Sequence, residues 1–237
     1  MILGRDLRPA RVPLAIFFLL CAVYLFTYNG LLRSIDELVL FSMTESLLQR
    51  GSLETPQTLF AGYHNPVGRP EPFQALAAVP LYALAQANPE WGKIQTAMLF
   101  NILVTAATAS LLWLILREMG YSQLLSLAGA LILGLATISW PYTRTFFREP
   151  LVALAYTLAF WLLLRYRASG QVRWAVSCLI VVGLSIATKF TSIVSLPVFA
   201  LGLWATTASE TRRRLWLPGV GLALALGTFG TLTLWAR

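Results

Sequence analysis

The sequence predicts an all-α fold, a polytopic bundle of about seven transmembrane helices with two interfacial helices in its first outer loop. Two observations on composition and pattern predict it. Of the 237 residues 57% are hydrophobic and only 12% are charged, and the mean hydropathy is +0.69. Apolar segments of membrane-spanning length also follow one another along most of the chain, more than a soluble core could bury. The bilayer is therefore the expected solvent.

Seven apolar segments carry this prediction, at about 12–28, 94–116, 123–140, 147–164, 173–188, 192–208 and 215–235. The first has a basic start but no small-residue cleavage pattern after it, which favours a retained helix over a removed signal peptide. The fifth and sixth form one apolar stretch, and a single helix of that length would measure about 50 Å against a hydrocarbon core of about 30 Å. Two short helices with a turn at Lys189 are therefore predicted.

The charges of alternate loops predict the orientation. With a cytoplasmic N-terminus, the inner loops carry ten cations and three acids, whereas the outer loops carry eight cations and seven acids. Positive charge collects on the cytoplasmic side of membrane proteins. We therefore expect a multi-pass protein of the plasma or inner membrane, in contact with membrane lipids. The isoelectric point of about 10.0 then reflects topology, and no nucleic-acid partner is expected.

The first outer loop, about residues 29–93, is the longest connection, and long ordered loops are usually functional. Ser34 followed by Glu37 has the form of a capping box, with Gly51 as a stop, and a second short helix is predicted from Phe73 onward. His64 and Arg69 lie in the turn-rich stretch between the two helices. They are candidates for substrate contact, although a solvated or hydrogen-bonded role is the simpler interpretation of a lone histidine.

Three acids are candidates for chemistry. Asp36 is the candidate general base, and Glu37 beside it would support it, although two acids in a first helical turn also suit the helix dipole. Glu149 follows the next outer loop and precedes Pro150 at the start of a span. Because a carboxylate cannot snorkel far to the interface, Glu149 is expected in a polar cavity, as a second catalytic acid.

Three cations on the same predicted side could hold a phosphate at membrane depth: Arg144, Arg148 and Lys189. Simpler interpretations are snorkelling arginines at the interface and a lysine in a plain turn. An acid that could serve as a base, together with cations that could hold an anionic lipid head, is what transfer from a lipid phosphate requires.

Metal and redox chemistry find little support. Cys21 and Cys178 both lie inside apolar segments, which indicates packed hydrophobic side chains and no disulfide. There is no CxxC or HExxH motif, so no Cys/His metal site is expected. Nothing in the sequence demands a cofactor.

The order of four stretches resembles the GT-C membrane glycosyltransferases, including the protein O-mannosyltransferases and bacterial aminoarabinose transferases of glycosyltransferase family 39. The stretches are "SIDE", "RPEPFQALAAVPLYAL", "YTRTFFREPLVALAYTLAFWLLL" and "GLSIATKFTSIVSLPVFAL". The resemblance covers nearly the whole chain and rests on their order, since no single motif is specific.

This resemblance implies an inverting transfer of a sugar from a polyprenyl-phosphate-linked donor to a hydroxyl of a protein, lipid or glycan on the extracytoplasmic face. Asp36 would be the base that takes the proton from the acceptor, and Glu149 would orient the acceptor or the base. Arg144, Arg148 and Lys189 would stabilise the leaving phosphate. Some members use a divalent ion, to which Asp36, Glu37 and Glu149 could contribute carboxylates.

Members of this class normally carry further spans and an extracytoplasmic domain after such a module. We therefore expect residues 1–237 to be a single transmembrane module, either of a longer chain or of a minimal member. Two other functions stay open, a small transporter or flippase and a non-catalytic membrane subunit. The gathering of ionisable residues on one predicted side of the membrane disfavours transport, which needs a path through both halves of the bilayer.

Overall fold

The computed structural model describes residues 11–56 and 71–207, and this part of the chain is helical, as predicted. The helices in chain order are α1 (Arg11–Phe26), α2 (Ile35–Arg50), α3 (Phe73–Gln86), α4 (Lys93–Glu118), α5 (Gln123–Leu135), α6 (Ser139–Tyr142), α7 (Glu149–Ser169), α8 (Val172–Thr188) and α9 (Leu196–Thr206), with a 3₁₀ turn at Phe190–Ser195 before α9.

Six of the seven predicted segments coincide with helices in the described residues, and the seventh, 215–235, lies outside them. Two helices of this part, α4 and α7, are long and apolar enough to cross a bilayer by themselves. Shorter apolar helices stand at the other predicted positions, at Arg11–Phe26, Gln123–Leu135, Val172–Thr188 and Phe190–Thr206. The helical class is thus confirmed, together with two candidate spans.

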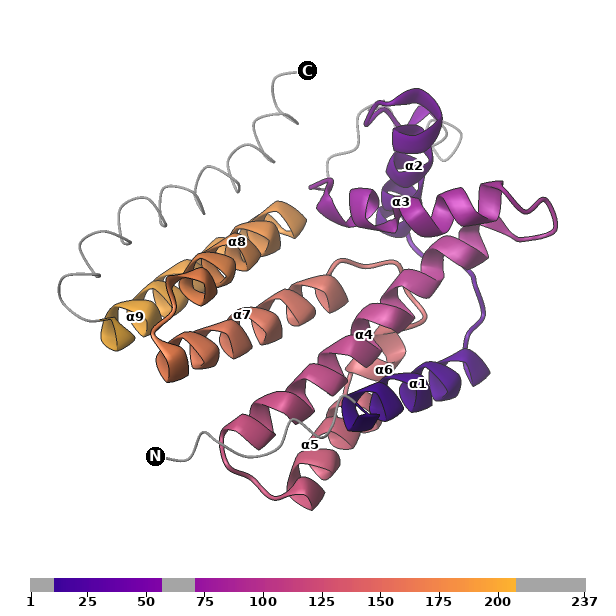
Figure 1. The fold of residues 1–237 in the computed structure, drawn as a ribbon. Coiled ribbons are helices and arrows are strands. Elements are labelled where there is room, and N and C mark those ends of the chain that lie inside the picture. Colours follow the sequence, from indigo (N-terminus) through magenta and orange to yellow (C-terminus); the bar gives the residue numbers. More distant parts are fainter. Residues whose placement is uncertain (1–10, 57–70, 208–237) are drawn as a thin grey trace.

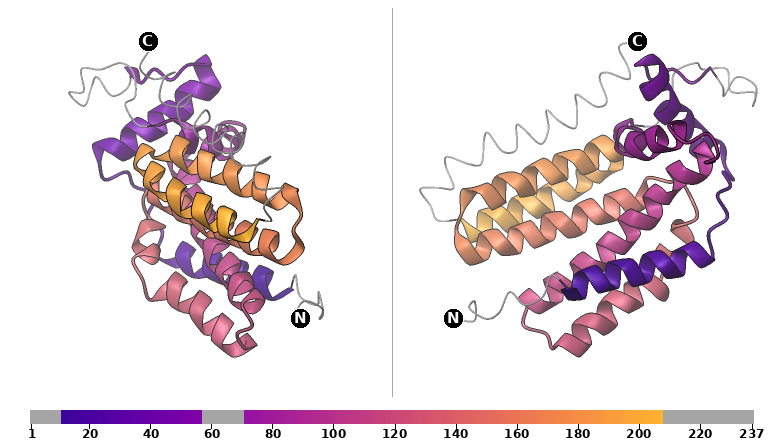
Figure 2. Two further views of the ribbon diagram at one scale, coloured as in Figure 1. Left: turned by 90° about the vertical axis from the view of Figure 1, so that its left-hand side faces the viewer. Right: turned by 45° about the vertical axis from the view of Figure 1, so that its right-hand side comes forward.

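The long helix α4 runs through the middle of the bundle (Figure 1). On one side it packs with α1 and α5 around a core that includes Leu20, Ile102 and Trp113. The Tyr24 hydroxyl ties α1 to α5 by donating to the Gly134 carbonyl at 2.9 Å. On the other side α7 packs against α4, and α7, α8 and α9 share a second core (Figure 2).

The third predicted segment, 123–140, is not one continuous helix. Helix α5 ends at Leu135, and the short helix α6 follows it. The hydroxyl of Thr137 donates to the Leu133 carbonyl at 2.6 Å, so a side chain takes up an acceptor near the helix end. Pro141 has no N–H to donate to a preceding turn. The break ends α5 and starts the connection through α6 to α7.

The predicted turn at Lys189 is confirmed. Helix α8 ends at Thr188, Lys189 is extended with φ −152° and ψ 114°, and the chain re-enters a helix through the 3₁₀ turn. Helices α7, α8 and α9 therefore alternate in direction. The thiol of Cys178 is buried between α8 and α7, where it donates to the Ala159 carbonyl at 3.3 Å, and both cysteines are free.

Both helices predicted in the first loop are present, as α2 and α3. The capping box of α2 forms as predicted, and Gly51 caps its other end in the left-handed region with φ 64°. A partly buried polar contact joins the two helices, in which the Tyr82 hydroxyl donates to Glu45 Oε1 at 2.8 Å and accepts from Gln49 Nε2 at 2.9 Å. This helix pair covers the end of the bundle at which α7 begins and α8 ends, called here the α2–α3 end (Figure 1).

Candidate active site

The segment Thr145–Phe147, which connects α6 to α7, is held by side chains from three helices. Asn101 of α4 donates from Nδ2 to the carbonyls of Thr145 at 2.8 Å and Phe147 at 2.9 Å. The Phe146 carbonyl accepts from Gln74 of α3 at 2.6 Å. Because backbone groups without partners are costly when buried, these side chains replace the helical hydrogen bonds that the segment lacks. The segment therefore presents Arg148 and Glu149 in a fixed place.

Glu37 supplies the link from α2 to this segment. Its Oε1 accepts from the Phe146 N–H at 2.8 Å, while Oε2 accepts from the N–H groups of Arg33 at 2.7 Å and Ser34 at 3.0 Å. The side chain is only 1% exposed. Glu37 therefore does more than cap its own helix, since it fastens the start of α2, where Asp36 stands, to the residues that precede Glu149.

Lys189 and Glu149 lie together at the α2–α3 end of the bundle. Lys189 Nζ donates to Glu149 Oε1 at 2.6 Å, which joins the start of α7 to the end of α8. Both side chains are partly exposed, at 32% and 41%. The pair is therefore reachable by a ligand, and two residues that the sequence indicated independently are brought into contact.

Arg148 forms a second ion pair, with Glu71, which lies just before α3. The other carboxylate oxygen of Glu71 accepts from the Phe190 N–H at 2.7 Å, and Arg148 Nη1 lies 3.5 Å from the Thr188 carbonyl. Sequence reasoning did not single out Glu71. The available signal was an acid between two prolines directly before a helix of the first loop, but its partners lie 77 and 119 residues away.

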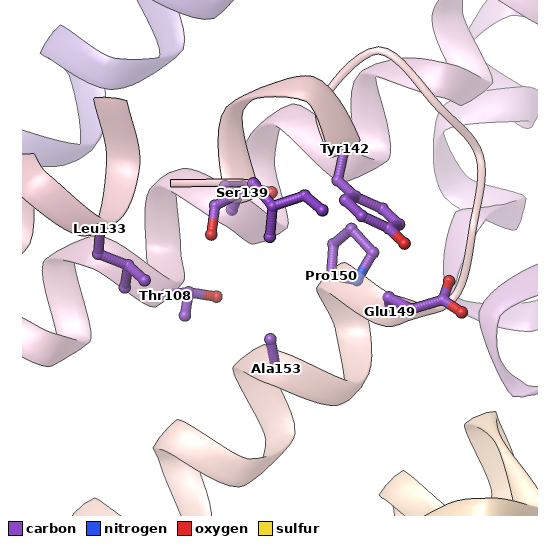
Figure 3. A pocket seen from close by; sticks show the side chains of 9 residues that line it. Thr108, Leu133, Ser139, Tyr142, Glu149, Pro150 and Ala153 are labelled. Carbon is purple, nitrogen blue, oxygen red and sulfur yellow. The ribbon is translucent and has the colours of Figure 1, made fainter. Parts of the chain in front are cut away.

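A cavity of about 260 Å³ opens beside Glu149, between α4, α5, α6 and α7 (Figure 3). Its wall is mostly apolar, with Leu133 at one end and Glu149 at the other, and Tyr142 and Pro150 next to the carboxylate. The hydroxyl of Thr105, which lines the cavity, is buried and has no hydrogen-bond partner. The cavity thus joins an apolar space to the charged residues at the helix ends.

The other predicted site residues lie apart from the two ion pairs. Arg144 lines a separate pocket of about 390 Å³, together with Thr27, Thr137 and Trp140, and its guanidinium makes no ion pair within the described ranges. Asp36 is exposed in the first turn of α2, next to Glu37. His64 and Arg69 fall in 57–70, outside the described residues.

The carboxylates do not assemble a metal site in the part of the chain that the structure describes. No three side chains of His, Cys, Asp and Glu come together there. Glu37 does not fit a metal ligand, because N–H groups donate to both of its oxygens, and Glu149 faces Lys189.

The arrangement suits an anionic ligand that competes with carboxylates. Two cations and two acids alternate in the order Glu71, Arg148, Glu149 and Lys189, so the resting cluster is electrically balanced. Exposed or half-exposed ion pairs contribute little to stability, about 0–1 kcal/mol. A phosphate can therefore take over Lys189 at modest cost, and this exchange releases the Glu149 carboxylate beside the cavity. The pair of Arg148 with Glu71 is more buried, with side chains that are 21% and 16% exposed.

Most of this chain matches the model of a known protein family. No curated protein sequence matches it. A family model described as dolichyl-phosphate-mannose-protein mannosyltransferase matches residues 76–235, about two thirds of the chain. The matched range contains Arg144, Arg148, Glu149 and Lys189, whereas Asp36, Glu37 and Glu71 precede it. The chain therefore belongs to the dolichyl-phosphate-mannose-protein mannosyltransferase family, a family of membrane glycosyltransferases that use a sugar carried on a lipid phosphate.

Proposed function

We propose that this protein transfers a sugar from a polyprenyl-phosphate-linked donor to a hydroxyl of a protein, lipid or glycan acceptor, with inversion, on the extracytoplasmic face of the membrane. The family supports the donor class, and mannose on a polyprenyl phosphate is the first donor to test. Family membership also favours transfer over the transporter and the non-catalytic subunit.

The proposed topology has seven spans with a cytoplasmic N-terminus. The charge difference between alternate loops supports it. The alternating directions of α7, α8 and α9 are consistent with it, because they bring Glu149 and Lys189 to one end of the bundle and Arg165 and Arg173 to the other. In this orientation the α2–α3 end faces outward, together with the cavity beside Glu149.

Asp36 is the proposed general base. It takes the proton of the acceptor hydroxyl, whose oxygen then attacks the anomeric carbon of the donor sugar while the bond to the phosphate oxygen breaks. Its exposure and its place next to the anchored Glu37 support this role. Glu149 orients the acceptor or the base once Lys189 has turned to the phosphate.

Lys189 and Arg148 are the proposed partners of the donor phosphate, and their positive charge stabilises the electron pair that the leaving phosphate receives. Arg144 is proposed to contact the same lipid from the neighbouring pocket across α6. The mostly apolar cavity beside Glu149 would take the part of the polyprenyl chain nearest the phosphate.

The observation that carries this proposal is the contact of Lys189 with Glu149, which lines that cavity. The test is transfer from a radiolabelled polyprenyl-phosphate mannose to a hydroxylated acceptor, with the full chain in lipid nanodiscs. We expect Asp36→Asn to lower turnover at least about a hundredfold, the usual contribution of a general base, while the apparent KM for the donor stays the same.

Glu90→Gln is the matched control, because Glu90 is an exposed carboxylate in the connection from α3 to α4 and belongs to no proposed site. It should leave turnover unchanged. Full turnover in Asp36→Asn would remove the base assignment. Donor binding is measured by native mass spectrometry of the wild type and of a Lys189→Met variant. If neither protein binds the donor, the proposed donor class is wrong.

A further inference from the structure

A second charged cluster lies at the opposite end of the bundle from Glu149 and Lys189. It consists of Glu118, the last residue of α4, Trp161 and Arg165 on α7, and Arg173 and Trp174 in the first turn of α8. Arg165 follows Glu149 by sixteen residues on the same helix, a separation of about 24 Å along its axis. The proposed transfer reaction does not use this cluster.

Arg165 is held from several directions. Its Nη1 donates to Glu118 Oε1 at 3.1 Å, and the Trp161 indole N–H donates to the same oxygen at 3.1 Å. Its guanidinium also lies 5.7 Å from the centroid of Trp161 and 5.4 Å from that of Trp174. The single acid of the cluster is therefore already occupied by Arg165.

Arg173 is positioned but not neutralised. Its guanidinium lies 4.9 Å over the ring of Trp174, which fixes its direction by a cation–π contact. Arg173 is exposed, and within the described ranges no carboxylate pairs with it. Because Trp174 also contacts Arg165, the two guanidiniums flank one ring. Arg117 and Arg167 lie at the same helix ends, so among the described residues four arginines stand beside one glutamate there.

An exposed apolar stripe begins beside Arg173. Val172, Val176 and Ile180 are 40%, 37% and 37% exposed, and their spacing of four places them along one face of α8. The stripe runs from the charged end of α8 toward its middle. A phosphate head with an acyl chain matches this surface, whereas a soluble anion would use the cation and leave the stripe uncovered.

We propose that this surface is a binding site for one anionic phospholipid, whose phosphate contacts Arg173 and whose acyl chain lies along Val172, Val176 and Ile180. The leaflet is the one opposite to the candidate active site. Charge complementarity supports a phosphate ligand, and the adjoining apolar stripe supports a lipid as its source. The inference stands independently of the proposed function, because it concerns lipid binding and requires no transfer.

The test is native mass spectrometry of the full chain, released from detergent with a titrated mixture of phosphatidylglycerol and phosphatidylcholine. Arg173→Gln should weaken the retention of phosphatidylglycerol about fivefold, the effect of removing one arginine near an anionic lipid surface. Arg167→Gln is the matched control, since Arg167 is an exposed arginine at the same end that makes no ring contact with the residues that the structure describes. It should change the retention less than twofold. Both side chains are exposed, so neither change should disturb the helix core.

Three outcomes would overturn the proposal. Equal retention in Arg173→Gln and the wild type would show that the arginine does not hold the lipid. Equal losses in Arg173→Gln and Arg167→Gln would reduce the effect to general surface charge. Displacement of phosphatidylglycerol by millimolar inorganic phosphate would assign the site to a free anion instead, whereas retention under phosphate supports the lipid.

Discussion

Lys189 Nζ lies 2.6 Å from Glu149 Oε1, although the residues belong to different helix ends and are separated by 40 positions in the chain. The sequence indicated each of them alone, as a cation in a turn and as an acid before a span. Glu149 also lines the cavity beside α7, so Lys189 contacts a carboxylate that borders this cavity.

The first prediction separates the structural role of this pair from its proposed chemical role. Lys189→Glu should lower stability by about 0.5–1 kcal/mol, because the pair is partly exposed, and should lower transfer at least about tenfold, as expected from losing a charge at the leaving group. The double variant Lys189→Glu with Glu149→Lys should recover the melting temperature in detergent but not the transfer rate, because cation and acid have exchanged places beside the cavity. Recovery of both would mean that only the attraction between the two residues matters.

The second prediction concerns Glu37. Glu37→Ala should lower the free energy of unfolding by about 3 kcal/mol, since it leaves three buried or half-buried N–H groups without their acceptor. Denaturation of the purified protein, followed by circular dichroism, measures the change. Glu54→Ala is the control, because Glu54 is exposed just after α2. Equal stabilities of the two variants would contradict the anchoring role of Glu37.

The third prediction concerns Asn101, which holds two carbonyls of the Thr145–Phe147 segment. Asn101→Asp should destabilise more than Asn101→Ala, by about 1–3 kcal/mol, because a buried carboxylate would face two acceptors that it cannot satisfy. Asn88→Asp provides the comparison, since Asn88 donates to the Leu84 carbonyl in an exposed hydrogen bond. Thermal unfolding of the three variants checks the order, and a smaller loss for Asn101→Asp than for Asn101→Ala would contradict it.

The fourth prediction compares two glycines with positive φ. A Cβ at Gly30, where φ is 61°, would lie 2.7 Å from Gln95 Cγ, whereas a Cβ at Gly51, where φ is 64°, meets nothing within 4 Å. Gly51→Ala should therefore cost only the backbone strain, about 1–2 kcal/mol. Gly30→Ala should cost roughly 1–3 kcal/mol more from the crowding. Melting temperatures of the two variants measure the difference, and equal values would show that Gln95 moves aside freely.

Local patterns predicted much of this fold. The apolar segments, the capping box at Ser34 and Glu37, and the turn at Lys189 all depend on neighbouring residues. The structure confirms the capping box and the turn, and it places helices in six of the seven apolar segments. The early end of α5 was not predicted, because the segment is apolar throughout and its hydropathy indicates one continuous helix. The Thr137 hydroxyl and the Pro141 ring interrupt the helix within it.

At the candidate site, the contacts between residues far apart in the sequence could not be predicted. Arg148, Glu149 and Lys189 were singled out by charge at predicted helix ends, but their carboxylate and lysine partners could not be assigned from spacing. Glu71 was missed, since nothing near it in the sequence reveals Arg148 or Phe190. The predicted grouping of Arg144 with Arg148 and Lys189 around one phosphate stays a prediction, because the structure places Arg144 in a neighbouring pocket.

The shared carboxylate of Glu37 has a consequence for local unfolding. One oxygen closes the first turn of α2 and the other holds the backbone of Phe146, so neither piece can open without breaking the same side chain's contacts. The start of α2 and the segment before α7 therefore open together, as one cooperative unit, where an ordinary helix end would fray by itself. Amide hydrogen exchange at Ser34 and Phe146 should share one rate, slower than that of the exposed end of α2 at Arg50.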